Sequence, residues 1–271
     1  MSRMILVGVV ASLVAGQVLA QEEQQQGPRA RSQKEADALM AFQNATDPDA
    51  RIQAAEKVLM KFKNTEYKEW LLYNMVASAG EKKDYVQMEV YGDRLLEVNP
   101  EHGLLLVDLA SVIAGQARPD DLDKSERLAK AEGFAKKALR IVPTMPKPNP
   151  QVTDELWLSE RQIMMAQIHE TLGIVAFMRD DYAGAEESFR KSIATAPRPR
   201  GTAYVRLGHA LLEQGQYAEA EEASEKAMEA GGIPTSVTRG LRGDIAKAKQ
   251  AGRKARPGTD GLEPQVETVT Q

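Results

Sequence analysis

The fold of this chain is decided by two adjacent stretches of its C-terminal half, which repeat each other. Residues 166–199 read AQIHETLGIVAFMRDDYAGAEESFRKSIATAPRP, and residues 201–234 read GTAYVRLGHALLEQGQYAEAEEASEKAMEAGGIP. A constant offset of 35 residues superposes Leu172-Gly173 on Leu207-Gly208, Tyr182 on Tyr217, Ala185 on Ala220, and Glu186-Glu187 on Glu221-Glu222. An offset of this size over so many positions is typical of a repeated two-helix unit.

Each copy has the features of a helical hairpin. Ala, Leu, Glu and Lys recur throughout both copies, which favours helix over strand. Polar turns at Arg179-Asp180-Asp181 and Gln214-Gly215-Gln216 divide the copies into a first and a second helix. Gly173 in the first helix allows close approach of the second helix, and Ala185 provides the complementary hollow. The sequence therefore predicts tightly packed, antiparallel helices.

These positions resemble the signature of the tetratricopeptide repeat, a helical hairpin of about 34 residues. Residues 166–199 match its seventh, eighth, twentieth, twenty-fourth, twenty-seventh and thirty-second positions with Leu172, Gly173, Ala185, Phe189, Ser192 and Pro197. Residues 201–234 match it less fully, because Ser224 replaces a large side chain and Gly232 replaces the proline that ends the second helix.

Three earlier segments keep parts of the same frame. Residues 69–102 lack the glycine and the aromatic residue of the pattern, and residues 101–143 carry an insertion over 116–124 between their two helices. Residues 34–64 are degenerate, although Asp47-Pro48 is typical of a helix start, with Asp as the cap and Pro in the first helical position. The resemblance thus weakens toward the N-terminus.

The predicted fold class is all-α, a right-handed α-solenoid of about four antiparallel helix pairs similar to a tetratricopeptide array. The expected segments are degenerate helix pairs over 34–143, a proline-rich connector over 144–152, a repeat pair with an N-terminally extended helix over 153–234, and a capping helix over 235–253. Four prolines between Pro143 and Pro150 predict a stiff, extended connector that splits the array. Beyond it, Thr153 or Asp154 is expected to cap the long helix.

Both ends of the chain are expected to lie outside the solenoid. Residues 1–20 have one early charge, an apolar run and small residues at the end, which predicts a signal peptide cleaved after Ala20. The alternative is a retained N-terminal anchor, but the run is too short and too interrupted to span a bilayer. Residues 21–33 predict a disordered tether, and residues 254–271 a disordered tail. The expected location is therefore periplasmic or secreted, with no membrane span after cleavage.

Composition argues against several classes of function. The formal net charge of −4 gives no strongly basic face for nucleic acid, and the absence of cysteine excludes disulfides and thiol chemistry. The stretch from His169 to Gly173 begins like a zinc-protease helix but has glycine where the second histidine ligand must stand. No catalytic cluster and no glycine-rich phosphate loop follow from the sequence. We expect no enzyme activity, no metal and no cofactor.

The resemblance also implies where a partner binds, because in tetratricopeptide arrays the first helices of the pairs line a concave groove. The positions that usually meet the ligand correspond to Trp70, Tyr73, Gln167, Glu170, Ile174, Phe177, Met178, Val205, His209, Leu212 and Glu213. Such a groove is mixed and fairly apolar, and suits an amphipathic helix or an extended segment. The alternative for Phe177 and Met178 is packing on a neighbouring helix.

The expected function is a non-catalytic scaffold or adaptor that binds protein partners in the bacterial cell envelope. Two alternatives remain open from the sequence. One is a self-associating module, in which the chain is a homo-oligomer, and the other is a non-catalytic subunit of an envelope enzyme or secretion complex. An enzyme ranks third, because it requires a catalytic cluster that the sequence does not provide.

Overall fold

The computed structural model describes residues 28–252, and within this range all regular structure is helical. The helices are α1 (Gln33–Gln43), α2 (Pro48–Lys61), α3 (Lys68–Glu81), α4 (Tyr85–Val98), α5 (Gly103–Gln116), α6 (Lys124–Ile141), the 3-10 helix η1 (Val142–Thr144), α7 (Asp154–Met178), α8 (Tyr182–Thr195), α9 (Gly201–Glu213), α10 (Tyr217–Ala230) and α11 (Thr235–Gln250). The predicted all-α class is confirmed.

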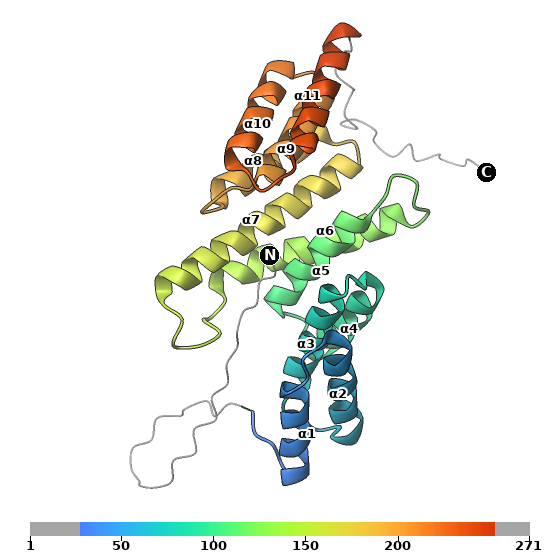
Figure 1. Cartoon of the computed structure of the whole chain (residues 1–271), viewed down its shortest axis with the longest axis vertical. Coiled ribbons are helices and arrows are strands. Elements are labelled where there is room, and N and C mark those ends of the chain that lie inside the picture. The colour runs from blue at the N-terminus through green and yellow to red at the C-terminus, as the bar shows by residue number, and fades with distance from the viewer. Residues whose placement is uncertain (1–27, 253–271) are drawn as a thin grey trace, which may run out of the picture.

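Consecutive helices form antiparallel pairs that stack into a solenoid, with α1 to α4 at one end, α5 to α7 in the middle and α8 to α11 at the other end (Figure 1). The solenoid is confirmed, but the described residues contain five pairs and a last helix, α11, where about four pairs were expected. The fifth pair is α1/α2. It forms despite its degenerate sequence, because Asp47 caps α2 by accepting a hydrogen bond from the Ala50 amide, and Leu39, Phe42 and Val58 are buried.

The turns between paired helices repeat the same geometry. Lys83, Asp180 and Gly215 each have a positive φ, at 59°, 62° and 73°. The residue after each of them donates its amide to a carbonyl five positions back, which closes the end of the first helix. Residues 69–102, which match the repeat pattern poorly, therefore share the turn of the two good copies.

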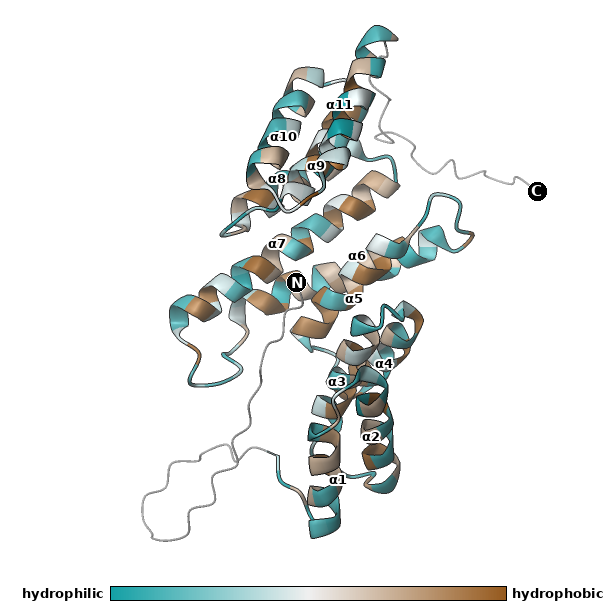
Figure 2. Ribbon diagram, viewed as in Figure 1, coloured by the Kyte–Doolittle hydropathy of each residue, from teal (hydrophilic) through white to brown (hydrophobic). Residues whose placement is uncertain are grey.

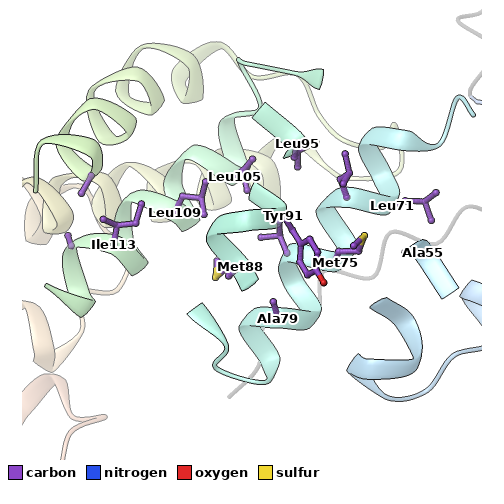
Figure 3. Packing of buried hydrophobic residues seen from close by; sticks show 14 of the residues in the cluster. Ala55, Leu71, Met75, Ala79, Met88, Tyr91, Leu95, Leu105, Leu109 and Ile113 are labelled. Atoms are coloured by element: carbon purple, nitrogen blue, oxygen red, sulfur yellow. The ribbon is translucent and has the colours of Figure 1, made fainter. Parts of the chain in front are cut away.

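The N-terminal core consists of large aliphatic side chains between helices. Leu71 and Met75 of α3, Leu95 of α4, and Leu105 and Leu109 of α5 are fully buried in one cluster, and Figure 3 shows where they lie along these helices. Along each helix, hydrophobic positions alternate with hydrophilic ones (Figure 2), as expected for helices that bury one side.

The C-terminal core combines large side chains with small residues at the helix contacts. A Cβ at Gly173 would lie 2.5 Å from the ring of Phe189, so the glycine is what lets α8 approach α7, as predicted. At Gly208 the nearest side chain is Leu241 of α11, at 2.6 Å from such a Cβ. Gly208 therefore accommodates the capping helix at least as much as its own partner, which the repeat pattern did not indicate.

The proline-rich segment does not split the array, and this expectation is corrected. Its first residues form η1, and the Trp157 indole N–H donates to the Met145 carbonyl at 3.0 Å. Trp157 and Met164 of α7 share one core cluster with α5 and α6. The reason is the length of α7, which is capped by Thr153 as expected and whose N-terminal half covers the preceding pair.

The predicted signal peptide, most of the tether and the predicted tail, residues 1–27 and 253–271, lie outside the described residues. Of the tether, Pro28 accepts a hydrogen bond from the Tyr67 hydroxyl at 2.7 Å, and the Arg29 amide donates to Glu66. Within residues 28–252, no helix combines the length and hydropathy that a bilayer span requires.

Candidate functional site

A cleft of about 500 Å³ opens between α7, the end of α8, the loop after it and the start of α9. We call it the α7/α9 cleft. One wall is a stripe of α7, the other is the loop from Ala196 to Arg200, and Ser192 and Ala203 complete the lining. The residues on the α7 wall are Ser159, Ile163, Ala166, Gln167 and Glu170. Because helical residues three or four apart share one face, this wall continues N-terminally to Leu156, which is 54% exposed.

Two prolines shape the opposite wall. Pro197 and Pro199 follow the end of α8, and each fixes its own φ and disfavours helix in the residue before it. The loop therefore runs extended to Arg200, whose own φ of −88° and ψ of 147° place it at the N-cap of α9. This conformation directs the Arg200 side chain toward α7, where it contacts Glu170.

Glu170 is the ionic centre of the cleft. Its side chain is only 6% exposed, and each carboxylate oxygen accepts from a different arginine. Arg200 Nη2 donates to Oε2 at 2.6 Å, and Arg206 Nη1 of α9 donates to Oε1. A carboxylate this deeply buried requires such partners, because desolvation otherwise disfavours its charged form.

The cleft carries an excess of positive charge. Its lining contains Arg198 and Arg200 against the single carboxylate of Glu170, which Arg206 of α9 also binds, and Arg198 makes no ion pair with any residue between 28 and 252. Each guanidinium has five N–H donors, so those on Arg200 and Arg206 that do not bind Glu170 stay available to a ligand. The cleft can therefore accept carboxylates beside an apolar α7 wall.

A second cleft, of about 250 Å³, lies among α8, α9 and α10 and differs in charge. It contains two cations and two carboxylates, and these pair with one another as Arg190 with Glu219 and Lys226 with Glu222. Because its charges are matched internally, it offers a charged ligand less than the α7/α9 cleft does.

The predicted groove residues of α7 divide into two groups. Gln167 and Glu170 line the cleft. Ile174, Phe177 and Met178 are half-buried and pack against core clusters, and the Phe177 ring meets the Tyr182 ring edge-on at 5.4 Å. For Phe177 and Met178 the structure therefore shows the packing role that was the alternative.

The predicted residues of α9 are less open than expected. Val205 and Leu212 are 7% and 4% exposed and belong to the C-terminal core, so the expectation that they face an open groove is corrected. The reason is that α9 contacts α7, α8, α10 and α11, which leaves little of its surface free. His209 and Glu213 are half-buried, and burial lowers the pKa of His209 although the carboxylates of Asp244 and Glu213 act in the other direction.

Trp70 and Tyr73 lie on α3, apart from the α7/α9 cleft. The Trp70 ring meets Phe42 edge-on at 4.8 Å, and Tyr73 stacks on His102 at 5.0 Å. Burial, followed by the nearby carboxylate of Asp108, raises the pKa of the Tyr73 hydroxyl well above its ordinary value. Both side chains thus stabilise the α1–α5 packing, and their contact with a partner stays a prediction.

Sequence reasoning missed the two arginines that line the cleft. The signal was present as the run Pro197-Arg198-Pro199-Arg200, in which two prolines hold two cations in an extended loop directly after a helix. Among the described residues, no group of three or more His, Asp or Glu side chains is arranged to hold a metal ion. What the arrangement offers is binding of an acidic, partly apolar segment.

Comparison with known proteins identifies the repeat. A family model described as tetratricopeptide repeat matches residues 200–230, which comprise α9 and α10. No curated protein has a significant sequence match to the chain.

Three solved structures illustrate the similarity of fold. PilW, described as a widely conserved type IV pilus biogenesis factor, has 15% identity and a TM-score of 0.56, over 81% of this chain and 87% of that one. MamA from Desulfovibrio magneticus RS-1 has 15% identity and a TM-score of 0.54, over 74% and 97%. A thermophilic tetratricopeptide-repeat protein of Thermus thermophilus has 17% identity and a TM-score of 0.50, over 78% and 99%. At these identities the likeness concerns the fold alone.

Proposed function

We propose that this chain, whose fold and residues 200–230 match the tetratricopeptide repeat, is a non-catalytic scaffold or adaptor that holds a segment of another protein in the α7/α9 cleft. The observation that carries the proposal is the cleft itself, in which Arg198 and Arg200 line one wall, the other wall is a partly apolar face of α7, and Arg200 and Arg206 bind the buried Glu170 carboxylate. The repeat fold supports protein binding in general, and the cleft supplies a specific place for it.

The chemistry of the cleft favours an extended segment. The open length of the α7 wall, from Leu156 to Glu170, offers apolar contact, and the loop from Ala196 to Arg200 offers guanidinium donors along one side. An extended chain can place apolar and acidic side chains on opposite sides in alternation, which matches these two walls.

We further propose that the protein acts in a bacterial envelope, either in the periplasm or after secretion. The support is the export pattern of residues 1–20 and the absence of cysteine, which makes the fold independent of the redox state of the compartment.

The test is photo-crosslinking in the native organism from a probe at Gln167, with a matched probe at Glu187, which is exposed on α8 outside the cleft. Adducts of Gln167 with specific envelope proteins, absent from Glu187, are expected. Equal labelling from both positions contradicts the cleft as the binding site, and adducts with cytoplasmic proteins contradict the location. Adducts of the chain with itself alone favour the self-associating alternative.

A further inference from the structure

The chain contains a segment with the chemistry that the α7/α9 cleft fits. Residues 257–271 carry Asp260, Glu263 and Glu267 and no Lys or Arg, with apolar Leu262 and Val266 between them and Val269 after them. These residues lie outside the described part of the chain. Their mixed acidic and apolar composition complements a cleft with one partly apolar wall and with Arg198 and Arg200 on the other wall.

We infer that residues 260–269 of this chain occupy its own α7/α9 cleft, with carboxylates on the arginines and aliphatic side chains on α7. The inference rests on the proposed function, because it names an internal competitor for the same cleft. A partner then binds only when it displaces this segment, which we call the acidic segment.

Charge is the first argument. Arg198 has no carboxylate partner between residues 28 and 252, and it stands in the same cleft as Arg200, whose side chain is 68% exposed. Glu170 is the one carboxylate in the lining, and Arg200 and Arg206 share it, so Arg198 and part of the charge of that pair stay unmatched. Glu263 and Glu267 of the acidic segment supply two negative charges four residues apart.

Reach is the second argument. A Cβ at Gly201 would lie 2.6 Å from the Gly231 carbonyl oxygen, so the turn before α11 touches the start of α9, beside the cleft. From that turn α11 runs for 16 residues, which is about 24 Å. Residues 253–261, when extended, span about 30 Å, so Leu262 can return along the length of α11.

The apolar part of the α7 wall is the third argument. Leu156, near the start of α7 and on the same face as the lining residues, is 54% exposed, and Ile163 lines the cleft half-buried. Each aliphatic side chain covered there gains roughly 25 cal/mol per Å² of area removed from water. Leu262 and Val266, four residues apart, are the aliphatic residues that flank Glu263 in the acidic segment.

The test uses the purified full chain with benzoylphenylalanine in place of Gln265, within the acidic segment. Irradiation is expected to give adducts within one chain, mapped by mass spectrometry to residues 156–167 or 196–206. The yield is expected to fall several-fold in Arg198→Glu and at about 1 M NaCl, where screening shortens the Debye length to about 3 Å.

Two variants control for folding and for charge alone. Arg239→Glu makes the same charge change on the exposed surface of α11 and should leave the yield unchanged. Glu263→Gln together with Glu267→Gln removes two carboxylates from the acidic segment without changing the solenoid, and should lower the crosslinking yield as Arg198→Glu does. An equal yield in all variants overturns the inference.

The other outcomes are equally decisive. Adducts between two chains at the cleft replace the proposal by exchange between copies, and the absence of adducts at the cleft overturns it. Partner adducts from Gln167 in the organism, together with no adduct from the acidic segment, leave the proposed function standing without this regulation. If neither the partner adducts from Gln167 nor the adducts from the acidic segment form, both the proposed function and this inference are overturned.

Discussion

The first helices of the pairs differ along the chain. In α7 and α9, Gly173 and Gly208 lie at close contacts with neighbouring helices, whereas α3 has the buried Val76 at the corresponding place in the repeat. Large aliphatic side chains such as Leu71, Leu105 and Ile113 dominate the buried positions of α3 and α5. Both regions share the same antiparallel pairing (Figure 1). The comparison shows that the repeat sequence is one solution to this packing, and that large side chains provide another.

Surface charge does not account for the difference between the regions. In both, second helices of successive pairs are joined by ion pairs, namely Arg94 with Glu56, Arg127 with Glu89, and Arg190 with Glu219. Exposed pairs of this kind contribute about 0–1 kcal/mol each. We therefore expect the two regions to differ mainly in how much the free energy of unfolding falls when a core side chain is enlarged or truncated.

The largest effect is expected from Leu71→Ala in α3, where large aliphatic side chains fill the core. Leu71 is 0% exposed, and truncation of such a side chain lowers the free energy of unfolding by about 2–5 kcal/mol. Because each repeat contacts only its neighbours, amide hydrogen exchange should accelerate in α1 to α4 and stay slow in α9 to α11. Acceleration of equal size in all helices would show that the regions unfold as one unit.

A smaller effect is expected when one methyl group is added to each region by a Gly→Ala substitution, and the two losses in the free energy of unfolding can be compared directly. Gly173→Ala places a Cβ 2.5 Å from the ring of Phe189, and overpacking of this kind lowers the free energy of unfolding by about 1–3 kcal/mol. Gly92→Ala meets both methyl groups of the fully buried Leu109, the nearer at 2.8 Å. A smaller loss is expected there, because the end of an aliphatic side chain yields more readily than a ring and because alanine gains up to about 1 kcal/mol in helix propensity over glycine.

Urea unfolding of both variants measures this contrast, with Gly115→Ala as the control, since no atom outside its own helix lies within 4 Å of that Cβ. Equal losses for Gly173→Ala and Gly92→Ala would contradict the difference between the regions. In Gly173→Ala, Phe189→Leu as a second change should recover part of the loss, because it removes the ring that the new methyl group meets.

The sequence predicts the two C-terminal pairs, α7/α8 and α9/α10, well, because the residues that define the repeat recur there at a fixed offset of 35. Gly173 against Phe189, and the turns at Asp180 and Gly215, follow from the pattern alone. The N-terminal pairs are harder to assign, since aliphatic side chains fill the same space without fixed positions. The turn at Lys83 shows that the backbone keeps the repeat where the side chains do not.

The cleft is predicted only in part. Gln167 and Glu170 follow from the resemblance, but Arg200 and Arg206 reach Glu170 from 30 and 36 residues away. Their convergence depends on how one pair stacks on the next, which local patterns do not encode. The burial of Val205 depends likewise on the surroundings of α9, which include α11.

The smallest effect is expected from pH, at the junction between α4 and α5. The His102 Nδ1 accepts from the Leu105 amide and so caps α5, while Nε2 lies 3.8 Å from the Glu69 carboxylate. Burial lowers the pKa of His102 below its ordinary value of 6.5, and outweighs the Glu69 carboxylate, which acts to raise it. The folded chain therefore takes up this proton at lower pH than the unfolded chain does.

It follows that the contribution of His102 to stability is complete above about pH 6.5 and is lost as the pH falls through the folded-state pKa. Its size is bounded by the free energy that one helix cap contributes, about 1 kcal/mol.

His102→Asn keeps a capping side chain that does not titrate. Urea unfolding at pH 7.5 and at pH 5 should give a smaller loss in His102→Asn than in the unsubstituted chain. The remaining loss includes His169 and His209, whose pKa values burial also lowers. An unchanged pH dependence would mean that the α5 cap does not titrate, and that His169 and His209 of the C-terminal pairs account for the loss of stability in acid.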